Sequence, residues 1–245
     1  MITASEVVNE LFNSAILRSQ VRFLLSLLDV SRTRYPKFPD KTFIELGSMR
    51  DFAMAEFCEF FDQVDTFIRY TPDELKSFLR RLQLLAYSQF WDSVSIQRVL
   101  FNLVNTCNGG QYDFEKYTKN RPSTFEIINE IKQRSRKANL GLGNFLETNY
   151  NNALRNAFVH SQYCFMEKYI WFLDFTKGSI PRLSLTLEEW EDIYFTTHSF
   201  ISILLRRRIE ELNRMRQLVP IRVDIPELRF KRIVLDSQGR WSVEN

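Results

Sequence analysis

Apolar residues recur at helical spacing over most of this chain. Residues 5–28 carry valine, leucine or phenylalanine at intervals of three or four positions, and residues 42–70 do so more strongly. This period gathers the apolar side chains on one face, so both stretches are expected to form amphipathic helices. In the second stretch the apolar positions are Phe52, Phe57, Phe60, Phe61, Val64 and Phe67. Residues 31–41 contain Pro36 and Pro39 and are expected to connect the two helices.

Capping residues predict a third helical stretch in the middle of the chain. The run Thr71-Pro72-Asp73-Glu74 combines an N-cap threonine, a first-turn proline and acidic residues, which is a typical helix start. The pattern then continues to Cys107, with a break expected near residues 88–94. Asn108-Gly109-Gly110 supplies the residues that end a helix.

Two more helices are predicted between residues 123 and 163. The first starts at the capping-box pattern Ser123-Thr-Phe-Glu126 and runs to about Lys137. Gly141 and Gly143 separate it from the second, which is expected from about Asn144.

The pattern changes to short strands after this helix. Tyr169–Leu173 and Arg182–Leu185 are predicted to pair as strands, and Thr186 then starts a long helix to about Gln217. The tail, residues 218–245, contains Pro220 and Pro226 and one predicted hairpin, formed by residues 229–235 and 240–243. We therefore predict a mainly α helical bundle, residues 1–217, with a small β-hairpin insertion and a β-containing C-terminal tail.

The amino-acid composition agrees with this fold class and indicates the cellular compartment. Of the 245 residues 44% are hydrophobic, including 22 phenylalanines, so the chain can build a large core, while only 7 glycines and 7 prolines argue against an all-β fold. Three widely spaced cysteines indicate a reducing compartment. No secretory signal or apolar run of transmembrane length is evident, so we expect a soluble cytoplasmic protein without membrane contact. The net charge of +3 does not by itself indicate a nucleic-acid partner.

A polar stripe marks the helix predicted from about Asn144. With roughly 100° of rotation per residue, one face of a straight helix carries only amides, an imidazole and a phenol. These residues are Asn149, Asn152, Asn156, His160 and Tyr163. Arg155 flanks the stripe, roughly 140° and about 7.5 Å along the axis from His160. Asparagine is a poor helix former, so the stripe is not explained by helix propensity.

Two interpretations of this stripe remain open. Histidine takes and gives a proton near neutral pH, and arginine offers a planar fork to a phosphate, so the pair suits attack on a phosphodiester. Asparagine and histidine together are also typical of a hydrogen-bonded interface, within the fold or between chains. No metal is required by the first interpretation, and we expect no metal or other cofactor because the sequence has no CxxC and no His-x3-His pair.

The run Arg155-Asn156-Ala157-Phe158-Val159-His160 resembles the Arg–polar–x3–His signature of the HEPN superfamily, all-α proteins many of which are metal-independent ribonucleases. The resemblance covers residues 50–165, or up to 215 with the last helix, and leaves residues 1–49 as an N-terminal helical extension. It implies that Arg155 stabilises the scissile phosphate, that His160 acts as general acid or base, and that Asn156 orients the histidine or the phosphate. It further implies RNA as substrate, a homodimer across this helix, defence or toxin–antitoxin biology, and a possible antitoxin or regulatory partner.

Some superfamily members keep the fold without activity, so a non-catalytic module that dimerises or binds RNA or a protein is the alternative. A plain helical scaffold with an internal polar stripe is the third. In a related toxin subgroup a tyrosine that is modified by a partner lies two residues after the histidine, whereas here Tyr163 lies three residues after it.

Several residues outside the signature are candidates for substrate contact. Asn152 and Tyr163 share the polar face, and Lys132, Arg134, Arg136 and Lys137 end the preceding helix. The basic group either extends a phosphate-binding surface or complements the helix C-terminus as solvated charge. Trp91-Asp92 either lines a cleft or is a core tryptophan beside a cap, and His198 is expected to be a structural histidine.

Overall fold

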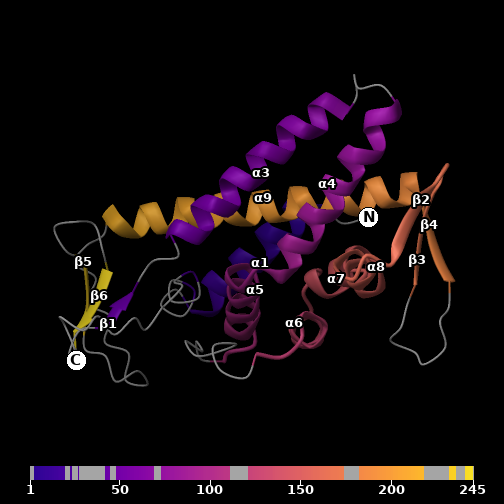
Figure 1. Cartoon of the computed structure of the whole chain (residues 1–245). Helices are drawn as coiled ribbons and strands as arrows, with labels where there is room; N and C mark the ends of the chain where they lie inside the picture. Colours follow the sequence, from indigo (N-terminus) through magenta and orange to yellow (C-terminus); the bar gives the residue numbers. More distant parts are fainter. Residues whose placement is uncertain are drawn as a thin grey trace.

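A computed structural model of the chain has helices over most of its length, which confirms the predicted mainly α fold class (Figure 1). The structure describes residues 3–19, 23, 27, 42–44, 48–68, 73–110, 121–173, 182–217, 232–235 and 241–244. The helices are α1 (Ala4–Arg18), α3 (Ser48–Ile68), α4 (Asp73–Asp92), α5 (Val94–Cys107), α6 (Thr124–Lys137), α7 (Leu142–Asn149), α8 (Asn152–Val159) and α9 (Leu187–Gln217).

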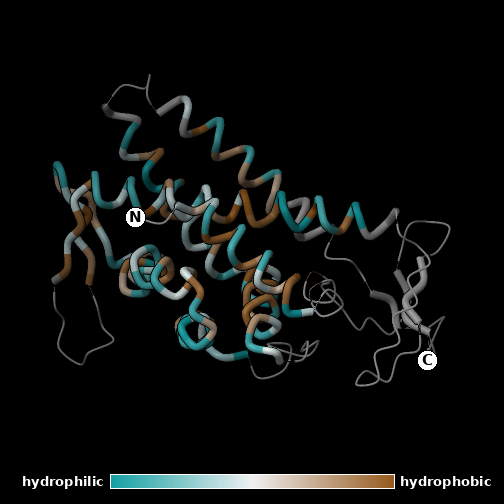
Figure 2. Tube along the Cα trace, turned by 180° about the vertical axis from the view of Figure 1, so that it is seen from behind, coloured by the Kyte–Doolittle hydropathy of each residue, from teal (hydrophilic) through white to brown (hydrophobic). Residues whose placement is uncertain are grey.

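The long helix α9 is the element on which the others assemble. It contacts α1, α3, α4 and α7, and Figure 1 shows it crossing the molecule behind the α3–α4 hairpin. Its buried positions recur every three or four residues, which gives a continuous apolar stripe. That stripe includes Trp190, Tyr194, Ile201, Leu204 and Leu205. Coloured by hydropathy, the helices alternate between hydrophobic and hydrophilic positions along their length (Figure 2).

Reciprocal side-chain caps start three of the helices. Ser123 accepts the backbone N–H of Glu126, and the Glu126 carboxylate accepts the backbone N–H of Ser123 at 2.8 Å, as the sequence predicts. Thr186 and Glu189 form the same arrangement at the start of α9. Thr3 and Glu6 repeat it at α1. These caps satisfy backbone N–H groups that a helix start leaves without partners.

Helices α5, α6 and α8 end in Schellman motifs. In each, the residue after the C-cap has a positive φ, and two backbone N–H groups return to carbonyls of the last turn. The residues with positive φ are Gly109, Asn139 and Ser161. At α8, Ser161 N–H donates to the Phe158 carbonyl and Gln162 N–H donates to the Ala157 carbonyl at 2.7 Å.

Ser161 adopts a backbone conformation that favours glycine, with φ 56°. We expect Ser161→Gly to raise the free energy of unfolding by about 0.5–1 kcal/mol, because glycine has no Cβ to strain the left-handed region. Thermal unfolding followed by circular dichroism should show a higher Tm. Gln133→Gly, a change in the interior of α6, is the control and should lower the Tm. A lower Tm for Ser161→Gly would contradict the prediction.

The prediction of one continuous helix from about Asn144 through Tyr163 is wrong. The chain instead forms α7, then α8, then the strand β2 (Tyr163–Met166). The break comes at Tyr150, whose extended backbone leaves a carbonyl of α7 and the N–H of Asn151 outside the helical ladder. The buried hydroxyl of Tyr87 satisfies both: it donates to the Asn149 carbonyl at 2.8 Å and accepts the Asn151 N–H at 2.7 Å.

The predicted insertion is a three-stranded antiparallel sheet rather than a hairpin. Strand β3 (Tyr169–Leu173) lies between β2 and β4 (Arg182–Thr186), and Tyr163 pairs with Phe172. The sequence pattern predicts the residues of β2 as the end of the preceding helix, but the Schellman motif at Ser161 stops α8 before them. The strands observed as β3 and β4 confirm the two that the sequence predicts.

A second small sheet joins strands that lie far apart in the sequence. Strand β6 (Trp241–Glu244) pairs with β5 (Arg232–Leu235) and with β1 (Thr42–Ile44), both antiparallel. The tail hairpin is therefore observed, whereas residues 42–44 are a strand and not the start of a helix. The two sheets lie at opposite ends of α9 (Figure 1).

Other predicted boundaries differ or fall outside the described residues. Helix α1 ends at Arg18, short of the predicted residue 28, because the backbone of Ser19 is extended. The predicted cap at Thr71 and the connection at 31–41 lie outside the described residues. No helix in the described ranges is both long enough and apolar enough to span a membrane.

Candidate functional site

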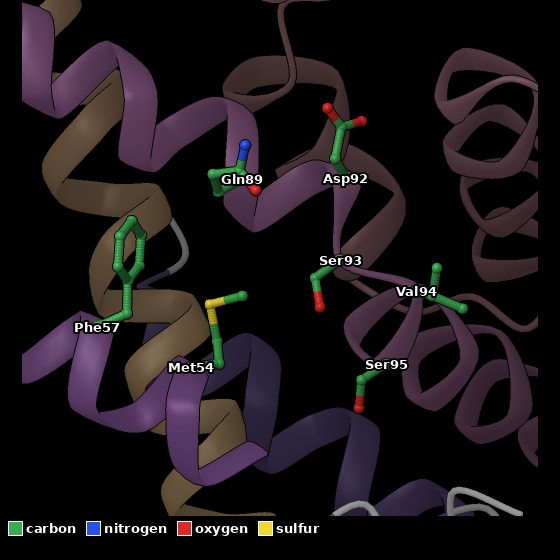
Figure 3. A pocket seen from close by; sticks show the side chains of 7 residues that line it. All are labelled: Met54, Phe57, Gln89, Asp92, Ser93, Val94 and Ser95. Carbon is green, nitrogen blue, oxygen red and sulfur yellow. The ribbon is translucent and has the colours of Figure 1, made fainter. Parts of the chain in front are cut away.

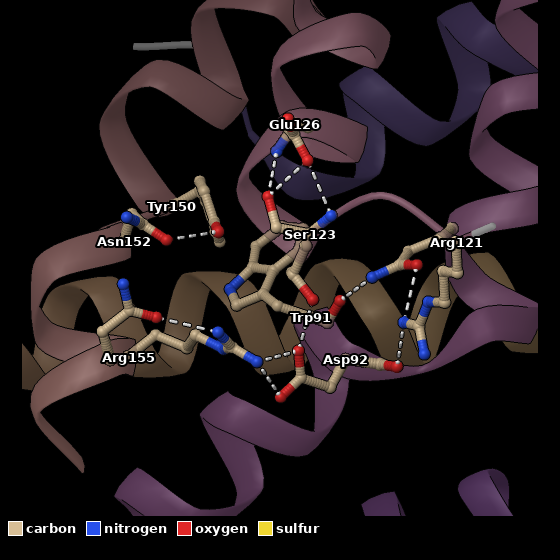
Figure 4. A network of polar contacts seen from close by, with 11 residues as sticks. Trp91, Asp92, Arg121, Ser123, Glu126, Tyr150, Asn152 and Arg155 are labelled. Carbon is tan, nitrogen blue, oxygen red and sulfur yellow. Dashed lines mark hydrogen bonds and ion pairs between the residues drawn. The ribbon is translucent and has the colours of Figure 1, made fainter. Parts of the chain in front are cut away.

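Arg155 is the centre of a network of polar contacts between α4, α6 and α8 (Figure 4). One terminal nitrogen of its guanidinium, Nη2, donates to both carboxylate oxygens of Asp92, at 2.5 and 2.6 Å. The other, Nη1, donates to the side-chain oxygen of Asn156 at 2.8 Å. The side chains of Arg155 and Asp92 are 19% and 26% exposed, so the ion pair is largely shielded from solvent.

Asp92 is the last residue of α4 and also receives a hydrogen bond from the start of α6. The Thr124 hydroxyl donates to its Oδ1 at 2.6 Å. The chain breaks at Ser93, whose hydroxyl accepts the Ile96 N–H as the N-cap of α5. This break, which the sequence predicts near residues 88–94, places the carboxylate at the meeting point of three helices.

A second arginine lies on the other side of Asp92. Arg121 Nη2 donates to the Asp92 carbonyl at 2.9 Å and to the side-chain oxygen of Gln97 at 3.0 Å. Gln97 is fully buried and donates to the Trp91 carbonyl, which fixes the amide in place. Arg121 therefore contacts the backbone of Asp92 rather than its carboxylate, and Arg155 is the guanidinium that forms the ion pair.

Tyr150 and Asn152 lie beside the Arg155 side chain in Figure 4. The Tyr150 hydroxyl donates to the Asn152 side-chain oxygen at 3.0 Å. Burial raises the pKa of Tyr150 well above its ordinary value, although the nearby Arg155 opposes that rise. The phenol therefore stays protonated at neutral pH and acts as a hydrogen-bond donor.

His160 is exposed at the C-terminus of α8. Its backbone N–H donates to the Asn156 carbonyl at 3.0 Å, so the helical path continues from Arg155 to His160. Its imidazole forms no hydrogen bond with another described residue and is open to a ligand. The two side chains therefore leave the same short helix about 7.5 Å apart along its axis.

The predicted polar stripe is only partly assembled. Asn152, Asn156 and His160 belong to α8 and its cap, but Asn149 is buried in α7, where it donates to the Phe145 carbonyl. Tyr163 lies in β2, with its ring against those of Phe158 and Phe165. The structure therefore gives Tyr163 a packing role and does not place it on a shared face with Asn156.

The basic residues at the end of α6 form ion pairs within the fold. Gly143 allows α7 to approach α6 closely, since an added Cβ would come 2.9 Å from Arg136 Cγ. Glu147 of α7 then binds Lys132 at 2.7 Å and Arg136 at 2.9 Å, and the hydrogen bond from Lys132 is the main reason that the pKa of Glu147 is lowered.

The other two basic residues of α6 differ from each other. Arg134 binds Glu130 and Asn105, and its guanidinium lies over the Phe101 ring. Lys137 is exposed and forms no ion pair with another described residue. Ion pairs within the fold therefore account for Lys132, Arg134 and Arg136, whereas Lys137 is the one of the four without such a partner among the described residues.

His198 and Cys58 are buried in the core, and Cys107 is partly buried against it. The His198 ring stacks between Phe90 and Tyr194, and its Nε2 lies 3.2 Å from the Cys58 carbonyl. All three cysteines are free, and burial raises the pKa of Cys58 to about 11 and that of Cys107 to about 12. These two thiols are therefore protonated at neutral pH and do not act as nucleophiles.

An open hollow of about 450 Å³ adjoins Asp92 on the side of α3. The side chains around it are Met54, Phe57, Gln89, Asp92, Ser93, Val94 and Ser95 (Figure 3). Trp91, by contrast, is fully buried in the core. Each interpretation of the Trp91-Asp92 pair therefore holds for one residue: the tryptophan belongs to the core and the aspartate lines a cavity.

The sequence does not predict Thr124 and Arg121 as residues of the site, and it predicts Asp92 only as part of a cleft, not as the partner of Arg155. Their contacts with it span long sequence separations, which no local pattern contains. The available signals were weak: Asp92 falls within the predicted helix break, and Thr124 follows the predicted N-cap Ser123. Among the described residues, no group of three or more His, Cys, Asp and Glu side chains could hold a metal ion.

Comparison of the chain with protein-family models, curated proteins and solved structures finds no match.

Proposed function

We propose that this chain is a cytoplasmic, metal-independent endoribonuclease with a HEPN-like site on α8. The main support is the pairing of a fixed cation with an exposed acid–base group. Arg155 is fixed by Asp92 and Asn156, while His160 is exposed about one and a half turns further along the same helix.

Arg155 retains a donor for a phosphate. A guanidinium has five N–H groups. Asp92 takes the two on Nη2, and Asn156 takes one on Nη1. The second Nη1 hydrogen and the Nε–H have no partner among the described residues, but the Nε atom is buried, so the Nη1 hydrogen is the donor that we assign to a phosphate. The carboxylate thus orients the cation, while Arg121 contributes a second positive charge on the other side of Asp92.

The reaction we propose is transfer of the phosphoryl group to the ribose. Neutral His160 takes the proton of the 2′-hydroxyl, and the 2′-oxygen attacks the phosphorus. The bond from phosphorus to the 5′-oxygen breaks, and an imidazolium returns a proton to that leaving oxygen. The products are a 2′,3′-cyclic phosphate and a 5′-hydroxyl. Arg155 stabilises the charge that develops on the phosphoryl oxygens, and a second copy of α8 in a homodimer supplies the acid.

The direct test is a ribonuclease assay in EDTA on end-labelled total RNA and tRNA. We expect wild-type protein to leave cyclic-phosphate ends. His160→Ala should cleave about 10²–10⁴-fold more slowly, which is the usual contribution of a general acid–base group. Because His160 is exposed, the His160→Ala protein should have the same Tm as wild type. The control is Asn144→Ala, an exposed polar residue of α7 that should cleave like wild type. Equal cleavage by wild type and His160→Ala would contradict the proposal.

A second function, a non-catalytic module of the same fold, is favoured by one observation. Asp92 already neutralises much of the charge of Arg155, as in a site built for stability. Under that alternative the protein dimerises, or binds RNA or a regulatory partner such as an antitoxin, and wild type shows binding without cleavage in the same experiment.

A further inference from the structure

The hollow beside Asp92 has the size and lining of a small-ligand site. Its volume of about 450 Å³ falls within the usual range for ligand pockets. Helix α3 contributes Met54 and Phe57 to one side, and the α4–α5 junction contributes the residues opposite. Figure 3 shows Met54 and Ser93 facing each other across it.

Apolar walls of the hollow are combined with a few polar groups. Met54, Phe57 and Val94 supply apolar surface, and the Phe57 ring is fixed by edge contacts with Phe61 and Phe90. Gln89 is exposed and its amide forms no hydrogen bond with another described residue, so it can both donate and accept. The Ser95 hydroxyl is fixed by a hydrogen bond of 2.9 Å from buried Arg208.

The charge of the lining selects an uncharged ligand. Asp92 is the single charged residue among the seven that line the hollow, and its carboxylate already binds Arg155 and Thr124. A flat heterocycle with donors and acceptors along its edge suits such a site. Stacking on an aromatic side chain with hydrogen bonds from an amide is how proteins commonly bind the bases of single-stranded RNA.

We propose that this hollow binds one nucleobase of an RNA strand whose phosphate lies at Arg155, and so sets the base preference of the protein. Asp92 connects the two places, because it binds Arg155 with its carboxylate and also lines the hollow. The amide of Gln89 contacts the edge of the base, and the thioether of Met54 and the ring of Phe57 cover its face. This inference rests on the proposed function, since it requires RNA at Arg155.

The test measures binding rather than cleavage. In a His160→Ala background, fluorescence anisotropy gives the Kd for labelled 12-nucleotide oligo(A), oligo(C) and oligo(U). We expect at least one homopolymer to bind about tenfold more tightly than another, a difference typical of one well-formed set of base contacts. Gln89→Ala should reduce that difference to less than about threefold while leaving the weakest Kd unchanged. Met54→Trp, which fills the hollow, should likewise reduce the difference in Kd between the homopolymers to less than about threefold.

Two controls separate the possible outcomes. Gln133→Ala removes an exposed glutamine of α6 outside the hollow and should keep the full preference, and thermal unfolding should show that each variant is folded. Equal binding of the three homopolymers by the parent protein, or an unchanged preference in both Gln89→Ala and Met54→Trp, would overturn the inference while leaving RNA binding in place. Absence of binding to any RNA would instead overturn the proposed function, and this inference with it.

Discussion

Tyr87→Phe is expected to lower the free energy of unfolding by about 2–3 kcal/mol, although it removes a single oxygen atom. That oxygen is fully buried and joins two helices, because it donates to the Asn149 carbonyl and accepts the Asn151 N–H. Without it, both backbone groups lose their partner at the break between α7 and α8. The Tm should fall by roughly 5–10 °C in thermal unfolding.

A second tyrosine provides a matched control for this change. Tyr163 is half-buried, and its hydroxyl forms no hydrogen bond with another described residue, so Tyr163→Phe should change stability by less than about 0.5 kcal/mol. If the two variants unfold at the same temperature, the Tyr87 hydroxyl does not hold the break. Because α8 carries Arg155, Tyr87→Phe should also reduce the cleavage rate, even though Tyr87 lies in the core.

Asp92→Ala is expected to have the largest combined effect on stability and on the site. It leaves Arg155 without its carboxylate and Thr124 without its acceptor. Breaking a fully buried ion pair costs about 3–5 kcal/mol, and the partial exposure of this one reduces our expectation to about 2–3 kcal/mol. Cleavage should fall about 100-fold or more, because the unheld guanidinium no longer has a fixed position.

A double-mutant cycle isolates the Asp92–Arg155 contact itself. We expect a coupling of about 1–3 kcal/mol between Asp92→Ala and Arg155→Ala in chemical denaturation. A coupling near zero would mean that the pair does not stabilise the fold. If Asp92→Ala instead increased cleavage, the carboxylate would restrain Arg155 rather than position it, and our account of the site would be wrong.

Local patterns predicted the features whose causes lie within a few residues. The capping boxes at Ser123 and Thr186 and the ending at Gly109 each depend on neighbours three to five positions away. The break between α7 and α8 depends instead on Tyr87, which is more than 60 residues away in sequence, and apolar periodicity alone extended the helix across it.

The residues of the candidate site also divide into those that lie close together in the sequence and those that lie far apart. The sequence predicts Arg155, Asn156 and His160 as candidates because one helical segment contains all three. Asp92 binds Arg155 across 63 positions, and the sheet of β1, β5 and β6 pairs residues 42–44 with residues 241–243. Such contacts depend on which helix packs on which, and a single sequence does not specify that pairing locally.

The sheet β2–β4 has a mechanical consequence for His160. Gln162 follows the end of α8 and accepts the Leu173 N–H of β3, while the Lys168 carbonyl accepts the Leu187 N–H at the first turn of α9. Helices α8 and α9 are therefore connected to each other through the strands β2, β3 and β4. A load applied to the start of α9, or to the outer strand β4, is transmitted along the strands to Gln162, two residues after His160 in the segment that joins α8 to β2.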